Sequence, residues 1–261
     1  MKKLEQLRDI FQFIAVASEQ VAHSWDLMDM FAELRGTDTR LAWENEVNRY
    51  QVELRMLYAE WVDDLAVSLS DYDYLSDEII LSSLAVLDAR LVALSRQRIF
   101  EVFDLGYGAG EIEYTVDVIS EVSSAMIDNE RYIHTSLIPD LRTVIYDAIH
   151  NPAFLLLGTA FLVGELFKKA SRVESYAGAA WNAVNKGAGM FASRQALPVY
   201  WLRDFLVEHC ESCLAYGERE YVSYEALLAE TGGVTPANGT ACYGNCRCSL
   251  MVLRDGEYVR P

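Results

Sequence analysis

Cysteine is the residue type whose spacing carries most chemical information in this chain. All five cysteines lie between residues 210 and 248 of the 261. Cys210 and Cys213 form a Cys-x-x-Cys pair, and Cys242, Cys246 and Cys248 follow after 28 intervening residues. Two thiolates separated by two residues can bind one metal ion from a single turn, and a second pair from a distant turn completes a tetrahedron. The spacing therefore predicts a structural zinc site without an open position for catalysis.

Five thiols compete for four ligand positions, so the ligand set stays open. The first choice is Cys210, Cys213, Cys246 and Cys248, with Cys242 as the substitute for one of the second pair. Because a single residue separates Cys246 from Cys248, ligation of one ion by both is strained. The set Cys210, Cys213, Cys242 and Cys246 is therefore nearly as good.

The alternatives to zinc are two disulfides with one free thiol, or five reduced thiols in a core. The chain starts Met1-Lys2-Lys3-Leu4-Glu5 and runs into an amphipathic pattern, which is not typical of a secretory signal. Without an oxidising compartment, Cys-x-x-Cys spacing favours metal over disulfides. His209 is a weaker candidate ligand, because a lone histidine beside a cysteine is usually an ordinary surface or core side chain.

The other groups capable of chemistry form no recognisable catalytic pattern, and we expect no enzyme. Three acidic pairs can bind a metal or transfer protons but are typical of solvated surfaces: Glu44 with Glu46, Asp63 with Asp64, and Glu111 with Glu113. The histidines His23, His134 and His150 have no metal-ligand spacing. Gly106-Tyr107-Gly108-Ala109-Gly110 lacks the spacing of a nucleotide-binding loop, and we expect a flexible interhelical loop there.

The formal net charge of −17 is unevenly distributed. Residues 1–150 contain 28 acidic and 12 basic residues, whereas residues 151–261 contain 11 acidic and 10 basic ones. Such a surface repels phosphate backbones, because nucleic-acid affinity depends mainly on Lys and Arg. We therefore expect no direct duplex binding. An acidic surface suits a basic partner or solubility at high concentration.

Long helices are expected to occupy the first 150 residues. Apolar residues recur at three- and four-residue intervals from Leu4 to Leu34 and from Arg40 to Ser68, and Glu78 to Phe103 is rich in Leu, Ala and Val. A fourth stretch, Glu111 to His150, is expected to be interrupted near Pro139, since proline removes an intrahelical donor. Short connectors between long helices are typical of an antiparallel bundle.

More apolar segments follow. Ala153 to Gly164 has twelve residues without a charge, too few for a bilayer span of about twenty, so we expect a buried core helix and no membrane association. Ser171 to Ala192 predicts a helix with a loose end at Gly187-Ala188-Gly189. Tyr200 to Val207 predicts a short helix or strand, and Ser249 to Val252 a strand.

The predicted fold class is mainly α, with a long-helix bundle followed by a small Cys-rich, zinc-knuckle-like C-terminal module that has minor β structure. Three parts are expected: an acidic helical bundle at 1–150, an apolar helical region at 151–208, and the metal-binding module at 209–261.

The cysteine pattern resembles the C-terminal signature of tailed-phage head morphogenesis proteins, the minor capsid proteins of the phage Mu F-like type. It consists of Cys210-Glu211-Ser212-Cys213 and, some thirty residues later, Asn245-Cys246-Arg247-Cys248-Ser249-Leu250. The segment from Arg172 through Tyr176 to Asn182 is similar to the family's helix before its cysteines. The resemblance covers roughly Ser171 to Leu253, about a third of the chain. In the family a His-Pro commonly precedes Asn-Cys-Arg-Cys; here Tyr243-Gly244 stands there, with Cys242 as the substitute for the third ligand.

The resemblance implies a structural role in the virion, as a minor capsid or head morphogenesis protein at the phage head or head-tail region. Its expected partners are the phage portal and major capsid proteins, with several copies per particle assembled in the host cytoplasm. Two alternatives stay open. One is a membrane-active protein in which Ala153 to Phe167 inserts during genome delivery, and the other is an enzyme or toxin domain attached to a phage-type Cys module.

Overall fold

The computed structural model describes residues 38–70, 77–108, 114–204, 209–241, 247–255 and 257–259. The helix expected from Leu4 to Leu34 lies outside these residues. The helices are α2 (Asp38–Ser70), α3 (Asp77–Tyr107), α4 (Val116–Tyr132), the π-helical segment η1 (Ile133–Leu137), α5 (Ile138–His150), α6 (Pro152–Leu157), α7 (Thr159–Phe167), α8 (Ala170–Ser175), α9 (Gly178–Gln195), α10 (Glu211–Tyr216) and α11 (Tyr224–Thr231). The strands are β1 (Val199–Leu202), β2 (Arg219–Tyr221), β3 (Ser249–Arg254) and β4 (Glu257–Val259).

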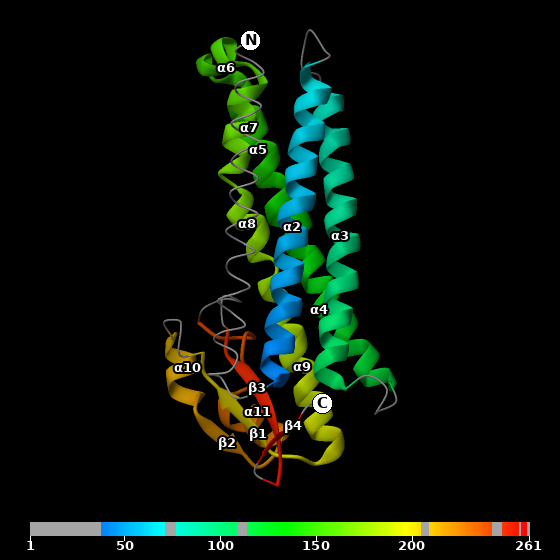
Figure 1. The fold of residues 1–261 in the computed structure, drawn as a ribbon, viewed down its shortest axis with the longest axis vertical. Coiled ribbons are helices and arrows are strands. Elements are labelled where there is room, and N and C mark those ends of the chain that lie inside the picture. Colours follow the sequence, from blue (N-terminus) through cyan, green and yellow to red (C-terminus); the bar gives the residue numbers. More distant parts are fainter. Residues whose placement is uncertain are drawn as a thin grey trace.

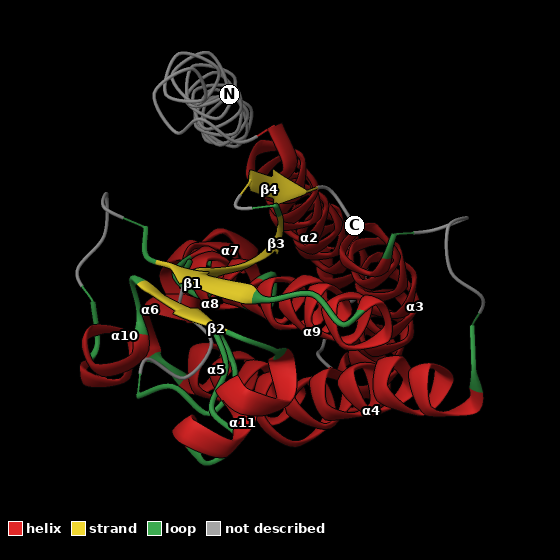
Figure 2. Cartoon of the chain, turned by 90° about the horizontal axis from the view of Figure 1, so that it is seen from below, coloured by secondary structure: helices red, strands yellow, loops and turns green. Residues whose placement is uncertain are grey.

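The molecule is a long helical bundle with a small sheet at one end (Figure 1). The helices α2 and α3 lie side by side, α4 and α5 return along α3, and α7 and α8 run beside α2. Viewed along the long axis, the strands lie across the end of the helices (Figure 2). The predicted mainly α fold, with minor β structure and a C-terminal Cys cluster, is confirmed.

The two longest helices confirm the sequence prediction. On α2, Trp43, Tyr50, Leu54, Trp61 and Leu65 recur at helical spacing and are all buried. Such a stripe holds a helix against its neighbours, because burial of each large apolar side chain stabilises the fold by about 1.5–3 kcal/mol.

The expected interruption near Pro139 is also confirmed. The stretch from Val116 to His150 is one continuous helical path in which η1, a π-helical segment, lies directly before Pro139 at the start of α5. Proline lacks a backbone donor and its ring crowds the preceding turn, so a wider turn at this point has a direct physical cause.

Two glycine predictions are wrong. Gly106 does not belong to a flexible loop but lies buried in the last turn of α3, and Gly187 does not belong to a loose end but lies buried inside α9. A methyl group on Gly187 would meet the Phe103 carbonyl oxygen at 2.3 Å, and one on Gly106 would meet the Val184 carbonyl oxygen at 2.2 Å. The glycines therefore allow the α3 and α9 backbones to touch.

The uncharged segment after Asn151 also differs from its prediction. Instead of one buried helix, it forms α6 and α7, separated by Gly158 with a φ of 59°. Helix α7 buries Leu162 and Leu166, but on α6 Leu156 is 86% exposed and Leu157 is 53% exposed. A backbone with positive φ is accessible mainly to glycine, and here it separates α6 from α7. Among the described helices, none has the length and apolar character needed to cross a membrane.

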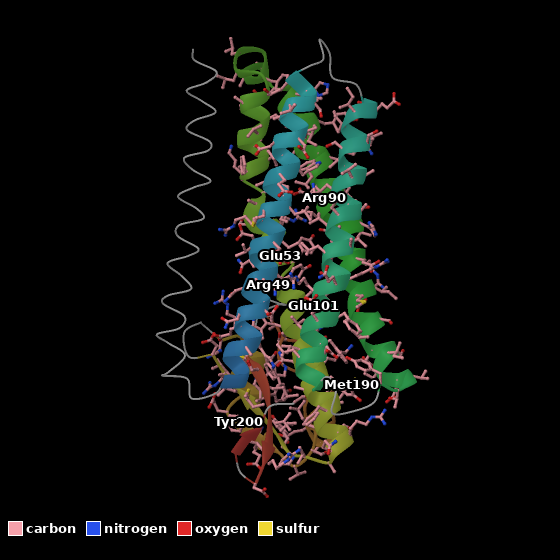
Figure 3. The ribbon with its side chains drawn as sticks, turned by 45° about the vertical axis from the view of Figure 1, so that its right-hand side comes forward. Arg49, Glu53, Arg90, Glu101, Met190 and Tyr200 are labelled. Atoms are coloured by element: carbon pink, nitrogen blue, oxygen red, sulfur yellow. The ribbon has the colours of Figure 1, made fainter. Side chains whose placement is uncertain are left out.

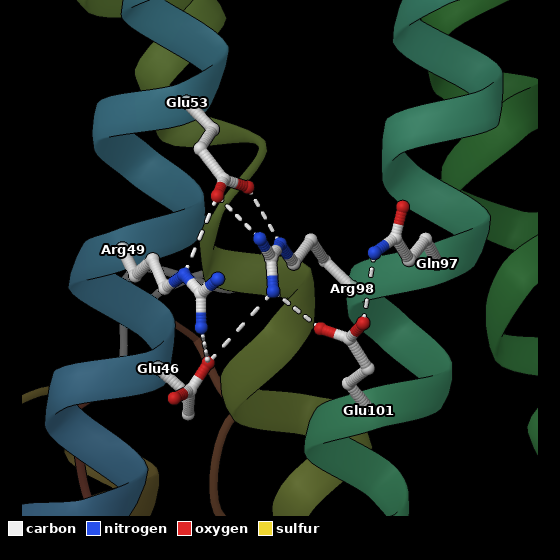
Figure 4. Close-up of polar contacts among 6 residues, drawn as sticks. All are labelled: Glu46, Arg49, Glu53, Gln97, Arg98 and Glu101. Carbon is white, nitrogen blue, oxygen red and sulfur yellow. Dashed lines mark hydrogen bonds and ion pairs between the residues drawn. The ribbon is translucent and has the colours of Figure 1, made fainter.

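An ion network joins α2 to α3 halfway along the bundle (Figures 3 and 4). The Arg98 guanidinium is 7% exposed and donates to both carboxylate oxygens of Glu53 and to Glu101. Glu46 lies 3.9 Å from Arg98, and Arg49 lies 3.4 Å from Glu53. A planar guanidinium can donate to two carboxylate oxygens at once only when the carboxylate lies in its plane. The network therefore helps to fix the register of the two helices.

The buried apolar residues form one cluster that extends from Trp43 to Val252. The helical stretch after Asn151 and the C-terminal sheet therefore share their core with α2 and α3. The division into parts at 1–150, 151–208 and 209–261 stays a prediction.

Candidate metal centre

The C-terminal sheet brings distant parts of the cysteine pattern together. Its strand order is β2-β1-β3-β4, and all neighbouring strands are antiparallel. In the β1–β3 pair, Leu202 is opposite Ser249. The chain that leaves β1 toward His209 and the chain that enters β3 through Cys248 therefore share one edge of the module. The strand at Ser249 to Val252 was predicted correctly, and β1 resolves the choice between helix and strand at Tyr200.

The Cys-x-x-Cys pair lies at the start of α10. Cys210 is the N-cap residue, and its carbonyl oxygen accepts a hydrogen bond of 3.0 Å from the Leu214 N–H. Cys213 is buried one turn later, and its carbonyl oxygen accepts from the Gly217 N–H at 2.9 Å. A side chain at Gly217 would meet that carbonyl oxygen at 2.5 Å, so glycine allows the chain to turn tightly after the helix.

Three cysteine sulfurs gather at this edge. Cys213 Sγ lies 3.6 Å from Cys210 Sγ and 3.4 Å from Cys248 Sγ. These separations exceed the disulfide bond length of about 2.05 Å, so these three residues are not bonded to one another. Four ligands around zinc at about 2.3 Å would place sulfurs about 3.8 Å apart. The observed separations are close to that arrangement.

His209 completes a cluster that can hold a metal ion. Its Nδ1 lies 3.9 Å from Cys248 Sγ, and the ligand atoms of His209, Cys213 and Cys248 all lie within 4.8 Å of one another. Sequence reasoning ranked His209 below the cysteines, because adjacency in the sequence does not show which way an imidazole points. Cys242 and Cys246 lie outside the described residues, so both four-cysteine ligand sets stay predictions.

Asn185 connects the cluster to the helical bundle. This residue is 1% exposed on α9. Its Nδ2 donates to the carbonyl oxygens of Cys248 at 3.2 Å and Pro236 at 3.3 Å, and its Oδ1 accepts from the Leu250 N–H at 2.7 Å. The amide therefore fixes the backbone on both sides of Ser249. No sequence motif identified Asn185, because one amide among small apolar residues carries no periodic signal.

A second polar contact holds the loop that leads back to the cysteines. Ser212, between the two cysteines of the pair, accepts a hydrogen bond of 3.2 Å from the Ala241 N–H. Ala241 immediately precedes Cys242 in the sequence. The described end of this loop is therefore attached to the turn that carries Cys210 and Cys213.

Among the described residues, no member of the acidic pairs and no histidine other than His209 belongs to the cluster. Glu44 is buried, which corrects the expectation of a solvated acid, whereas Glu111, Glu113 and His23 lie outside the described residues. Partial burial raises the pKa of Asp63 above its usual range, and the neighbouring charge of Asp64 adds to this effect. His134 pairs with Asp88 at 2.8 Å, and His150 Nδ1 lies 2.7 Å from the Tyr146 carbonyl oxygen.

A pocket of about 350 Å³, lined by both charged and apolar side chains, lies between α4, α9 and α11. Lys186 pairs with Glu121 at 2.7 Å, and Arg194 pairs with Asp117 at 2.6 Å. Burial raises the pKa of Tyr224 to about 12, so its hydroxyl keeps its proton at neutral pH. These cations are held in ion pairs, which is typical of a structural contact between helices.

In comparisons with protein-family models, curated proteins and solved structures, nothing matches this chain.

Proposed function

We propose that this chain is a non-enzymatic structural component of a tailed-phage virion, a minor capsid or head morphogenesis protein whose C-terminal module is closed by zinc. One observation carries the proposal. Cys213 of the Cys-x-x-Cys pair and Cys248 of the Asn-Cys-Arg-Cys run, which are far apart in the sequence, have sulfurs 3.4 Å apart. The two halves of the phage-type signature thus form one site.

Zinc is the metal that suits this cluster best. Thiolate and imidazole ligands in a tetrahedron favour zinc, and four protein ligands leave no position for a reactive water. The ion would join the start of α10 to the start of β3 and so close the small sheet. Because metal binding adds free energy to folding, it would stabilise this loop-rich module.

The rest of the chain supports a role in assembly. The long bundle provides an extended surface, and the strong negative charge of residues 1–150 favours a basic partner. Under this proposal, several copies bind the portal or the major capsid protein during head assembly in the host cytoplasm and remain in the virion.

Mass spectrometry of particles from the tailed phage that encodes this chain tests the proposal. The chain should be present at a fixed, low number of copies relative to the major capsid protein, and cross-linking should connect it to portal or capsid subunits. Absence from both mature particles and assembly intermediates would overturn the proposal, even if the purified chain binds zinc.

The exposed leucines of α6 favour a second candidate, a membrane-active protein that acts during genome delivery. Helix α6, which carries Leu156 and Leu157, lies at the end of the bundle opposite the sheet (Figure 1). A cosedimentation assay with neutral and anionic liposomes tests this candidate. Binding should fall in Leu156→Ser but not in Val222→Ser, a control on a residue that is also highly exposed. If the native chain stays in the supernatant with both liposomes, this candidate is wrong.

A further inference from the structure

We infer that His209 is a metal ligand and that the site is of the Cys₃His type, with Cys213 and Cys248 as two of its sulfur ligands and Cys210, from the same turn as Cys213, as the third. This inference rests on the proposed zinc site but changes its ligand set. It replaces both sequence-derived sets, each of which has four sulfurs. It also assigns no ligand role to Cys242 or Cys246.

The distances between the ligand atoms support this set. Around zinc, with bonds of about 2.3 Å to sulfur and about 2.0–2.1 Å to nitrogen, tetrahedral geometry places two sulfurs about 3.8 Å apart and a sulfur and a nitrogen about 3.6 Å apart. The observed separations are 3.6 Å for Cys210–Cys213, 3.4 Å for Cys213–Cys248 and 3.9 Å for His209–Cys248. These three separations lie within a few tenths of an ångström of the ideal ones. Cys210 lies outside the group whose ligand atoms are all within 4.8 Å of one another, so its side chain must turn further toward the ion to bind it.

Burial of the cluster gives a second argument. Cys213 and Cys248 are buried, and His209 and Cys210 are half-buried at the edge of the module. The ligand atoms of His209 and the two buried cysteines lie within 4.8 Å of one another. Packing of the described residues therefore places an imidazole nitrogen beside two buried sulfurs, where all three can bind one ion.

A nitrogen ligand changes the charge of the metal site. Three thiolates and one neutral imidazole give a zinc site with one negative charge less than four thiolates do. Zinc accepts nitrogen and sulfur ligands together, whereas iron–sulfur clusters are held mostly by four cysteine thiolates. The site should therefore hold zinc in preference to an iron–sulfur cluster.

Metal spectroscopy on the full chain tests the ligand set. X-ray absorption at the zinc edge should fit three sulfurs and one nitrogen, and the Co(II)-substituted chain should show charge-transfer bands of three thiolates. His209→Ala should weaken metal binding by more than the roughly 10–100-fold that loss of a supporting residue causes. His209→Cys should restore binding with a four-sulfur spectrum. His150→Ala, which alters another histidine at an exposed position, should change nothing.

The cysteine variants separate this inference from the zinc proposal itself. Cys210→Ser and Cys213→Ser should lose the metal, whereas Cys242→Ser and Cys246→Ser should retain it with the native spectrum. A four-sulfur spectrum in the native chain, or loss of metal in Cys246→Ser together with retention in His209→Ala, would overturn the role of His209 and leave the zinc site standing. A native chain that binds no zinc would overturn both.

Discussion

Replacement of Asn185 by alanine should loosen the whole cysteine module, although the residue lies on a bundle helix. The substitution removes three hydrogen bonds. Nδ2 donates to the carbonyl oxygens of Cys248 and Pro236, and Oδ1 accepts from the Leu250 N–H. A typical intramolecular hydrogen bond contributes about 1 kcal/mol net, and a buried N–H left without a partner costs about 1–3 kcal/mol. We therefore expect a loss of about 3 kcal/mol in the free energy of unfolding.

For a chain of this size, about 3 kcal/mol corresponds to a fall in Tm of roughly 6–12 °C. Urea unfolding followed by circular dichroism measures the change directly. Asn182→Ala is a matched control on the same helix, because within the described part of the chain the buried Oδ1 of Asn182 accepts no hydrogen bond. Since Asn185 also fixes the backbone at Cys248, zinc affinity should fall at least about tenfold. If both variants unfold at the same urea concentration as the native chain, Asn185 does not connect bundle and module as described.

Three further predictions concern the bundle. Gly187→Ala should lower the free energy of unfolding by about 1–3 kcal/mol or more, because the new methyl group meets the α3 backbone. Gly164→Ala, which has open space around it, should be neutral or stabilising. Thermal melts of the two variants measure the difference. Arg98→Ala should lower the free energy of unfolding in urea by about 1–3 kcal/mol, since it leaves partly buried carboxylates facing one another. Arg90 is exposed, so Arg90→Ala should lower it by less than about 1 kcal/mol. The hydrogen bond from Arg96 holds the pKa of Glu130 below its usual range, so the stability from this pair is present above that range and is lost as pH falls through the folded-state pKa. Arg96→Gln should therefore lower Tm at pH 7 but not in strong acid, and an equal loss at both would show that the charge pair is not responsible.

Periodicity was sufficient to predict the long helices because their apolar stripes face a core. Trp43 and Trp61 lie on such a stripe, and both are buried on α2 as the spacing implies. The same reasoning failed for Gly106 and Gly187. In one sequence a glycine that ends a helix and a glycine that lets two helices touch look alike, and only the partner backbone distinguishes them.

The candidate site was only partly predictable for a related reason. The spacing of Cys210 and Cys213 identified one half of the site, because two ligands on one turn are a local property of the chain. Cys248 was also among the predicted ligands, but its approach to Cys213 and the position of His209 beside it depend on the antiparallel pairing of β1 with β3, which is a long-range property. The supporting role of Asn185 depends on the packing of α9 against that sheet, and residue spacing does not encode it.

Zinc content tests the central claim most directly. Elemental analysis of the full chain, purified without chelator, should be combined with thiol titration after denaturation. With the proposed metal centre we expect about one zinc per chain, its loss in Cys213→Ser, and five titratable thiols once the metal is released. A native chain without metal, and with two to four thiols missing from the titration, would mean disulfides in place of the zinc site and would contradict the account.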